Sequence, residues 1–329
     1  MKLIRTVDSA GHILCHDMTR IVPGEVKETR FRKGHIIKAD DIPVLLDMGK
    51  ESLYVWEQAP GKLHEEEAAE KLRVVCQGEN LRAAPVREGK IELFAHIPGL
   101  LKINSEKVYA LNNIGDVAIM TARGNRGIQE EEKAAALKAI PLLIDEEKIR
   151  CAEEICGGEK IINVIPYRQK KVGLIITGSE VYNHRIPDTG SAIVRKKIEA
   201  FPVESVQTIL LEDDPEKITA AINAMIGLGC GLVICTGGMS VDPDDKTPLA
   251  IKNTGARIVT YGVPLMPGTM LMLAYHEKGG VSIPLIGAPA CVFYEHTTAL
   301  DILLPRLMAD DIILREELAM LGEGGIVTN

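Results

Sequence analysis

The sequence predicts an α/β protein whose C-terminal part is a doubly wound, mostly parallel sheet with helices on both faces. Two observations predict this fold. From residue 172 onward, short apolar runs alternate with stretches of helical periodicity, which is the pattern of strands joined by crossover helices. Before that point the apolar runs are interrupted by frequent turns, which predicts smaller α+β regions.

The C-terminal elements follow one another in a regular order. Asp214-Pro215-Glu216 predicts a helix start, because it joins an N-cap, a first-turn proline and an acid near the positive end of the helix dipole. We expect strands at residues 172–176, 203–211, 231–235, 257–260, 270–274 and 281–286. We expect helices at residues 191–200 (capped by Ser191), 214–226, 247–252 and 292–308, the last one kinked or broken at Pro305.

The first half of the chain is expected to hold shorter elements. We expect helices at residues 42–48, 64–73, 130–139 and 145–155, a turn leading into a helix at 99–104, and strands at 53–56, 90–94 and 117–120. The helix at 130–139 is predicted from its charged, alanine-rich composition. The polar stretch 166–171 marks the main boundary, so we divide the chain into 1–62, 63–168, 169–312 and a C-terminal tail at 313–329.

Composition and charge narrow the function classes. The 329 residues are 46% hydrophobic with a net charge of −8, so the chain can bury cores, and its surface as a whole is unsuited to nucleic acid. No run is apolar for long enough to cross a membrane, and the first residues lack the apolar core of a signal peptide. The seven scattered cysteines suit reduced thiols. We therefore expect a cytoplasmic protein without membrane or nucleic-acid partners, and we expect a homo-oligomer.

The stretch Leu232–Thr247 carries the strongest chemical signal. It begins as an apolar run that is typical of a buried parallel strand, and Thr236-Gly237-Gly238 then lets the backbone turn sharply and approach a ligand. Glycine amides can hold a phosphate, and carboxylates can hold Mg²⁺ that bridges to it. The alternative is a simple turn with solvated aspartates. The side chains that could supply this chemistry are Ser240, Asp242, Asp244 and Asp245.

Three more loops follow strands of the same predicted sheet. They are Thr177–Gly190, Pro264–Thr269 and Gly287–Ala290. In a parallel sheet, the loops at the carboxyl ends of the strands converge on one edge. Convergence would bring backbone amides and hydroxyls beside the acidic side chains, which suits a phosphorylated ligand with Mg²⁺ better than an apolar one.

These loops together resemble the molybdopterin-binding domain, which occurs in molybdopterin adenylyltransferases, molybdenumtransferases and gephyrin. The resemblance is carried by Thr177-Gly-Ser-Glu180, Asp188-Thr-Gly190, Thr236–Asp245 and Pro267-Gly268, and it covers residues 170 to 310. Residues 32–49 are more loosely similar to the N-terminal part of the molybdenumtransferases.

The resemblance implies a pocket for the pterin dithiolene phosphate. Its implied ligands are molybdopterin or adenylylated molybdopterin, molybdate and Mg²⁺. Asp188 and Asp245 would be catalytic, and the aspartates that would hold the metal are Asp242, Asp244 and Asp245. The residues expected to bind the cofactor are Thr177, Gly178, Ser179, Glu180, Thr189, Gly190, Ser191, Thr236, Gly237, Gly238, Met239, Ser240, Pro267, Gly268 and Gly287.

Three positions depart from the usual motifs of that family. Ser179 replaces the acid of Gly-Asp-Glu, Thr269 replaces the lysine of Pro-Gly-Lys-Pro, and Ala288 replaces the asparagine of Pro-Gly-Asn-Pro. The leading hypothesis is a molybdopterin-binding protein of molybdenum cofactor biosynthesis, related to the molybdenumtransferases, which insert molybdate with Mg²⁺ into adenylylated molybdopterin. The departures favour a second hypothesis, a non-catalytic carrier or sensor of the cofactor.

A third hypothesis is a nucleotide-processing hydrolase of the competence/damage-inducible type. Thr236-Gly237-Gly238 followed by Asp244-Asp245-Lys246-Thr247 fits the pattern of that related domain too.

Overall fold

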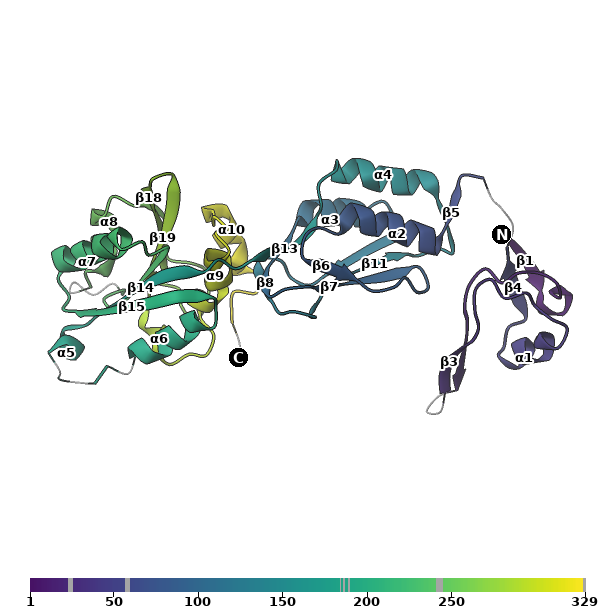
Figure 1. Cartoon of the computed structure of the whole chain (residues 1–329), viewed down its shortest axis with the longest axis horizontal. Helices are drawn as coiled ribbons and strands as arrows, with labels where there is room; N and C mark the ends of the chain where they lie inside the picture. The colour runs from purple at the N-terminus through teal and green to yellow at the C-terminus, as the bar shows by residue number, and fades with distance from the viewer. Residues whose placement is uncertain are drawn as a thin grey trace. The chain divides into compact units, whose positions relative to one another are not determined.

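The computed structural model describes residues 1–22, 26–56, 60–183, 185, 187–188, 190–240 and 245–327, with the backbone alone at residues 22, 26, 27, 179 and 180. The chain divides into two compact units (Figure 1). Unit 1 is Met1–Ile97, Lys102–Gly124 and Glu130–Val164, and unit 2 is Pro98–Leu101, Asn125–Gln129 and Ile165–Asn329. No helix within these described residues is both long and apolar enough to cross a bilayer.

Unit 2 is built on a six-stranded sheet in the order β15-β14-β16-β19-β18-β17. The first four strands are parallel to one another, and only β18 runs antiparallel to both of its neighbours, so that β17 has the direction of the first four. The predicted mostly parallel sheet is confirmed. The strands are β14 (Lys170–Thr177), β15 (Val203–Leu211), β16 (Leu232–Thr236), β17 (Arg257–Tyr261), β18 (Met272–Lys278) and β19 (Val281–Ala288).

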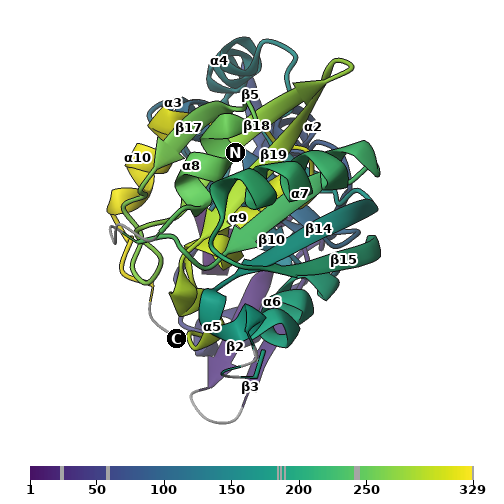
Figure 2. The same cartoon turned by 90° about the vertical axis from the view of Figure 1, so that its left-hand side faces the viewer.

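Helices cover both faces of this sheet. The described helices of unit 2 are α5 (Ser179–Tyr182), α6 (Gly190–Glu199), α7 (Pro215–Gly227), α8 (Thr247–Asn253), α9 (Ala299–Met308) and α10 (Arg315–Ala319). Figure 2 shows α7 and α8 on one face of the sheet. On β14, Leu174 and Ile176 belong to the core formed with α6 and α9, whereas Ile175 belongs to the core formed with α7 and α8. Because both faces of β14 are covered, its sequence is an almost continuous apolar run rather than an alternating one.

The final segment of unit 2 is packed against its core. Ile313 and Leu318 are buried in the α6–α9 core, and the Ile313 amide donates to the Tyr275 hydroxyl at 2.9 Å. The buried guanidinium of Arg306 bonds Asp311 and also Glu317 at 2.8 Å. Residues 313–327, expected as a tail, are therefore part of the folded unit, with η3 (Met320–Gly322) following α10.

Unit 1 begins with small elements around a core of Leu14, Leu45 and Leu53. These elements are β1 (Lys2–Arg5), η1 (Thr6–Asp8), the hairpin of β2 (Met18–Val22) and β3 (Val26–Phe31), α1 (Asp41–Asp47) and β4 (Ser52–Val55). The His64 side chain links this part to the next. Its Nε2 donates to the Cys15 carbonyl at 2.7 Å, and its Nδ1 accepts from the Glu66 amide at the start of α2 (Glu65–Cys76).

The rest of unit 1 is an antiparallel sheet in the order β6-β7-β11-β9 with helices packed on it. In Figure 1, α2, α3 and α4 lie together on one side of these strands. The strands are β6 (Leu81–Ala83), β7 (Lys90–Ala95), β9 (Val117–Thr121) and β11 (Lys133–Ala139), and the other elements are α3 (Ser105–Asn112), α4 (Glu146–Cys156), β5 (Lys62–His64), β12 (Leu143–Asp145) and β13 (Ile162–Pro166). As predicted, Ala68, Ala69 and Leu72 form the buried face of α2.

Three of the expected elements were wrong. The alanine-rich segment 130–139 is the strand β11, because pairing with both β7 and β9 outweighs the small helix preference of alanine. Residues 99–103 form the strand β8, which pairs with β10 (Arg126–Ile128), and the helix begins only after Asn104, whose side chain accepts from the Lys107 amide.

The third error is the helix expected at residues 292–308. Residues 290–293 form a 3₁₀ turn, η2 (Ala290–Phe293), and α9 begins separately at Ala299. Thr298 and Asp301 form a capping box that fixes this start, which the expected single helix ignored.

Candidate functional site

A cleft of about 450 Å³ opens in unit 2 where β14 and β16 end. Its polar lining consists of the side chains of Thr177, Asp188, Asp213 and Asp245, together with Gly178, Gly190, Gly237 and Gly238. Its apolar lining consists of Ile176, Val181, Pro187, Ala290, Phe293 and Tyr294. The structure therefore brings the predicted loops 177–190 and 236–247 together at the carboxyl ends of parallel strands, as expected for a ligand site, and Ala290 of the predicted loop 287–290 joins them.

Backbone hydrogen bonds hold the start of the loop 177–190. The Gly178 amide donates to the Leu211 carbonyl at 3.2 Å, so it is already engaged within the fold. The Gly178 carbonyl in turn accepts from the amides of Val181 and Tyr182, which forms the short helix α5. The side chains of Ser179 and Glu180, which were expected to bind the cofactor, lie outside the described part of the chain.

Asp188 lies just before the helix α6 and bonds its first turn. Its Oδ1 accepts from the Ser191 amide at 2.9 Å, so Asp188 takes the capping role that the sequence assigned to Ser191. Gly190 lies against the ring of Phe293, and a Cβ built on Gly190 would be 2.6 Å from Phe293 Cε1. Thr189 is outside the described residues.

The glycine pair after β16 has two different structural roles. Gly237 has φ +97°, and a Cβ there would overlap the Thr177 carbonyl oxygen and lie 2.7 Å from Thr177 Oγ1. The Gly237 carbonyl also accepts from the buried Thr247 hydroxyl at 2.8 Å. Gly237 is therefore required for the ends of β14 and β16 to pack together.

Gly238 faces a carboxylate that the sequence did not single out. Gly238 has φ +55°, and a Cβ there would lie 3.3 Å from Asp213 Oδ1 and from Thr247 Oγ1. Asp213 lies two positions after the end of β15 and lines the cleft beside the glycine turn. The signal was available, because Asp213 follows a predicted strand whose carboxyl end lies on the same edge.

Asp245 holds the far end of the same loop. Its Oδ2 accepts from the Ser240 amide at 2.6 Å. The Tyr261 hydroxyl, on β17, lies 3.2 Å from the carbonyls of both Met239 and Ser240, a clamp that the sequence did not reveal. Burial and the nearby Asp245 charge raise the pKa of Tyr261.

The metal-binding residues expected in this loop are only partly described. Asp242 and Asp244 lie outside the described residues, whereas Asp245 is on the cleft wall. Within the described ranges, no group of three or more histidine, cysteine, aspartate or glutamate side chains has the arrangement of a metal site.

Several other predicted residues pack inside unit 2 and do not line the cleft. Thr236 is fully buried at the end of β16. Gly287 lies against the buried Met239, because a Cβ on Gly287 would be 2.5 Å from Met239 Cε. Pro267, which follows a cis peptide bond, accepts from the Ala299 amide, and Gly268 lies against the Cβ of Ala299 at the start of α9.

The cleft is acidic, although a phosphate ligand would be anionic. Asp188, Asp213 and Asp245 are three carboxylates, and no lysine, arginine or histidine is found among the described lining residues. Carboxylates repel a phosphate unless a cation lies between them. A divalent cation bound by carboxylate oxygens and by the ligand phosphate together would remove this repulsion.

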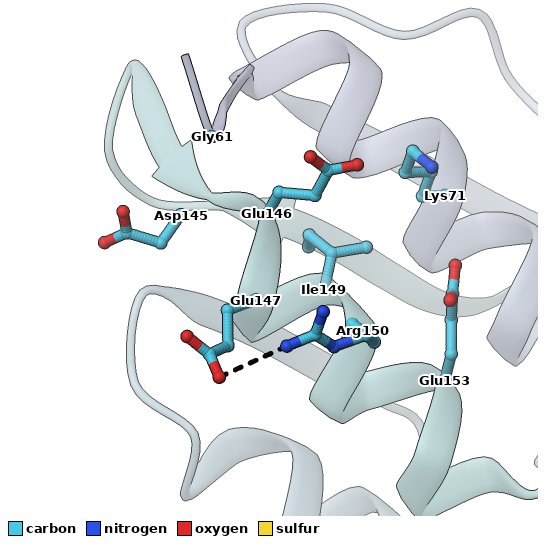
Figure 3. A pocket seen from close by; sticks show the side chains of 8 residues that line it. All are labelled: Gly61, Lys71, Asp145, Glu146, Glu147, Ile149, Arg150 and Glu153. Atoms are coloured by element: carbon cyan, nitrogen blue, oxygen red, sulfur yellow. Dashed lines mark hydrogen bonds and ion pairs between the residues drawn. The ribbon is translucent and has the colours of Figure 1, made fainter. Parts of the chain in front are cut away.

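Unit 1 contains a separate hollow of about 410 Å³ beside the first turns of α4 (Figure 3). Glu146, Glu147 and Glu153 surround it together with Lys71 and Arg150, and Arg150 bonds Glu147 at 3.2 Å. Its glutamates and its arginine are exposed and charges of both signs are mixed, as on an ordinary solvated surface. We therefore place the candidate site in the cleft of unit 2.

The family comparison agrees with this placement. Residues 173–309 match a family model described as "Probable molybdopterin binding domain". Residues 173–309 belong to the molybdopterin-binding domain family. This molybdopterin-binding domain contains every described residue that lines the cleft. Residues 3–57 match the model of a domain of unknown function.

Two curated relatives and several solved structures, one of them from Pyrococcus furiosus, are similar to part of the chain. A molybdopterin molybdenumtransferase of Synechococcus elongatus is 30% identical over 147 residues, which are 42% of this chain and 36% of that protein. A CinA-like protein of Mycolicibacterium vanbaalenii is 30% identical over 77 residues, which are 23% of this chain and 18% of that protein. The chain thus spans about a third or less of these relatives.

The solved structure from Pyrococcus furiosus is that of the tungsten cofactor synthesizing protein MoaB. It is 14% identical with a TM-score of 0.34, and the match covers 42% of this chain and 88% of that chain.

Proposed function

We propose that the cleft of the molybdopterin-binding domain binds molybdopterin together with a divalent cation such as Mg²⁺. The observation that carries this proposal is the convergence of Asp188, Asp213 and Asp245 on one cleft beside the turn Gly237-Gly238. Each carboxylate follows a different strand, so the arrangement is a product of the fold and not of one acidic run.

The polar and apolar lining residues of the cleft suit the two ends of this ligand. The cation would be held by the carboxylates and would receive the terminal phosphate, which otherwise would be repelled. The pterin ring would lie beside the aromatic side chains of Phe293 and Tyr294. A cleft of about 450 Å³ is within the usual size of small-molecule sites.

We propose molybdate insertion into adenylylated molybdopterin as the reaction, because the curated relative is a molybdopterin molybdenumtransferase. Asp188 and Asp245 would hold the cation on the phosphate side of the cleft, which would make the adenylyl phosphate bond easier to hydrolyse. A carrier or sensor of the cofactor is the second candidate. Ser179 and Thr269, which replace a carboxylate and a lysine of the family motifs, favour this second candidate.

The binding proposal is tested by calorimetry of the full chain with molybdopterin, in Mg²⁺ and in EDTA. Asp213→Asn and Asp245→Asn should each weaken the Mg²⁺-dependent binding roughly ten- to a hundredfold, because each removes a charged ligand. Glu199→Gln is the matched control, since this exposed acid on α6 lies outside the cleft. Equal affinities with and without Mg²⁺, or an equal loss in Glu199→Gln, would contradict the cation site.

A turnover experiment separates the two candidate functions. The protein is incubated with adenylylated molybdopterin, molybdate and Mg²⁺, and the release of AMP is measured. Insertion predicts AMP release that depends on both molybdate and protein. Binding without release supports the carrier or sensor.

A further inference from the structure

One of the residues that line the cleft is an exposed aromatic side chain. Tyr294 is 75% exposed although it lines the cleft. It follows the 3₁₀ turn η2, and its amide donates to the Cys291 carbonyl at 3.1 Å, which fixes the backbone that carries the ring. A large ring left in water beside a polar cleft is a surface that a ligand can cover.

A second aromatic residue packs edge to face against the Tyr294 ring. The Phe293 and Tyr294 ring centroids are 6.4 Å apart with an interplanar angle of 77°, a favourable edge-to-face geometry. Phe293 is itself held against the backbone of Gly190, where no side chain could fit without displacing the ring. Val292, on the same turn, is fully buried. Phe293 and Tyr294, which together form the aromatic wall of the cleft, are therefore positioned before any ligand binds.

The polar lining of the cleft makes different demands on a ligand. It offers carboxylates and the glycine turn, which suit a cation and an anionic group, whereas the aromatic wall offers a flat π face. A ligand that satisfies both kinds of lining has a planar conjugated ring at one end and an anionic group at the other.

We infer that Tyr294 stacks on the planar ring of the ligand and sets the specificity of the cleft for flat heterocycles. This inference rests on the proposed function, because it assigns the pterin ring to one wall of that site. Tyr294 is a positioning residue in this scheme, and its aromatic face, not its hydroxyl, is the group that acts.

The test compares Tyr294→Ala, Tyr294→Phe and Tyr109→Ala in the full chain. Tyr109 is 74% exposed and lies in unit 1, so its removal deletes an equally exposed ring away from the cleft. The probes are molybdopterin and 6-hydroxymethylpterin, which has the ring without a phosphate, and binding is followed by quenching of pterin fluorescence. Tyr294→Ala should weaken the binding of both probes roughly five- to a hundredfold.

The two remaining variants should bind both probes like the parent, because Tyr294→Phe keeps the aromatic face and Tyr109→Ala leaves the cleft intact. If the parent binds molybdopterin and Tyr294→Ala binds both probes equally well, the stacking role is overturned while the proposed function stands. A loss in Tyr294→Phe as large as in Tyr294→Ala would also overturn it, since the hydroxyl would then be the contact. A parent that binds neither probe would overturn the proposed function itself.

Discussion

The packing of Gly237 gives a prediction whose size can be derived from the structure. In Gly237→Ala, the added Cβ would overlap the Thr177 carbonyl oxygen, which is main chain and cannot rotate away. Gly255 provides the matched control. It also has a positive φ, +76°, and a Cβ there meets nothing within 4 Å. Both substitutions introduce backbone strain, and only Gly237→Ala adds the clash.

The expected losses follow from these two contributions. An alanine in the left-handed region costs about 1–2 kcal/mol, which is the whole effect expected for Gly255→Ala. Forcing an extra carbon into a packed position costs about 1–3 kcal/mol more. Gly237→Ala should therefore lower the free energy of unfolding of unit 2 by roughly 2–5 kcal/mol.

Native-state hydrogen exchange on the full chain measures this difference where it arises. Exchange in β14 and β16 reports the opening of the central sheet of unit 2, whatever unit 1 does. The protection of these strands should fall more in Gly237→Ala than in Gly255→Ala. Equal losses in the two variants would refute the reasoning, because the contact with Thr177 would then contribute nothing.

Three further predictions concern a buried lysine, the clamp on the glycine loop and the stability of unit 1 in acid. Lys170 is 7% exposed, and its ammonium group donates to the Leu307 carbonyl at 2.7 Å. Lys170→Met should therefore lower the free energy of unfolding, measured in urea melts, by roughly 1.5–3 kcal/mol. In the control variant Lys171→Met, that free energy should change by less than about 0.5 kcal/mol. Tyr261→Phe removes the hydroxyl that bonds the carbonyls of Met239 and Ser240. This variant should exchange the amides of residues 237–240 faster, and its free energy of unfolding should fall by about 0.5–1.5 kcal/mol. Unchanged amide exchange at these residues would count against the clamp. Burial lowers the pKa of His64 below its ordinary 6.5 in the folded protein. The contribution of the neutral His64 ring to the stability of unit 1 is therefore complete above pH 6.5, and it is lost as the pH falls through the folded-state pKa. Urea melts followed by the fluorescence of the single tryptophan, whose ring is 6.0 Å from the His64 ring, should show stability falling with acid, and a His64→Gln variant with the same acid dependence would contradict this assignment.

The fold of unit 2 could be predicted because its signals are local. The run Val172–Ile176 is apolar at every position but a glycine, and a central strand covered on both faces requires that pattern. The start of α7 was also predictable, since Asp214 accepts from the amides of Glu216 and Lys217 as an N-cap should. The segment 130–139 was mispredicted because its alanines favour a helix only weakly, while its partners β7 and β9 are distant in sequence.

The candidate site divides in the same way. The motif residues Asp188, Gly237, Gly238 and Asp245 could be placed on one edge of the sheet, because the rule for parallel strands needs only the strand ends. Tyr261 could not, because its contact with the loop depends on an antiparallel bulged pairing of β17 with β18. The aromatic wall was hidden for another reason, since a single helix was expected across η2 and the loop that follows it.

The carboxylate missing at position 179 has a counterpart in the cleft that comes from a neighbouring strand. The family resemblance expects a carboxylate at position 179, where this chain has a serine. In the structure, Asp213 brings a carboxylate into the same cleft from the end of β15, the strand beside β14. The register pairs Thr177 with Leu211, so a residue two positions after β15 arrives next to the loop that follows β14. Because parallel strands present their carboxyl ends side by side, charge can be supplied from a neighbouring strand without a change of fold. The strand ends that share an edge are therefore a better guide to this cleft than any single motif.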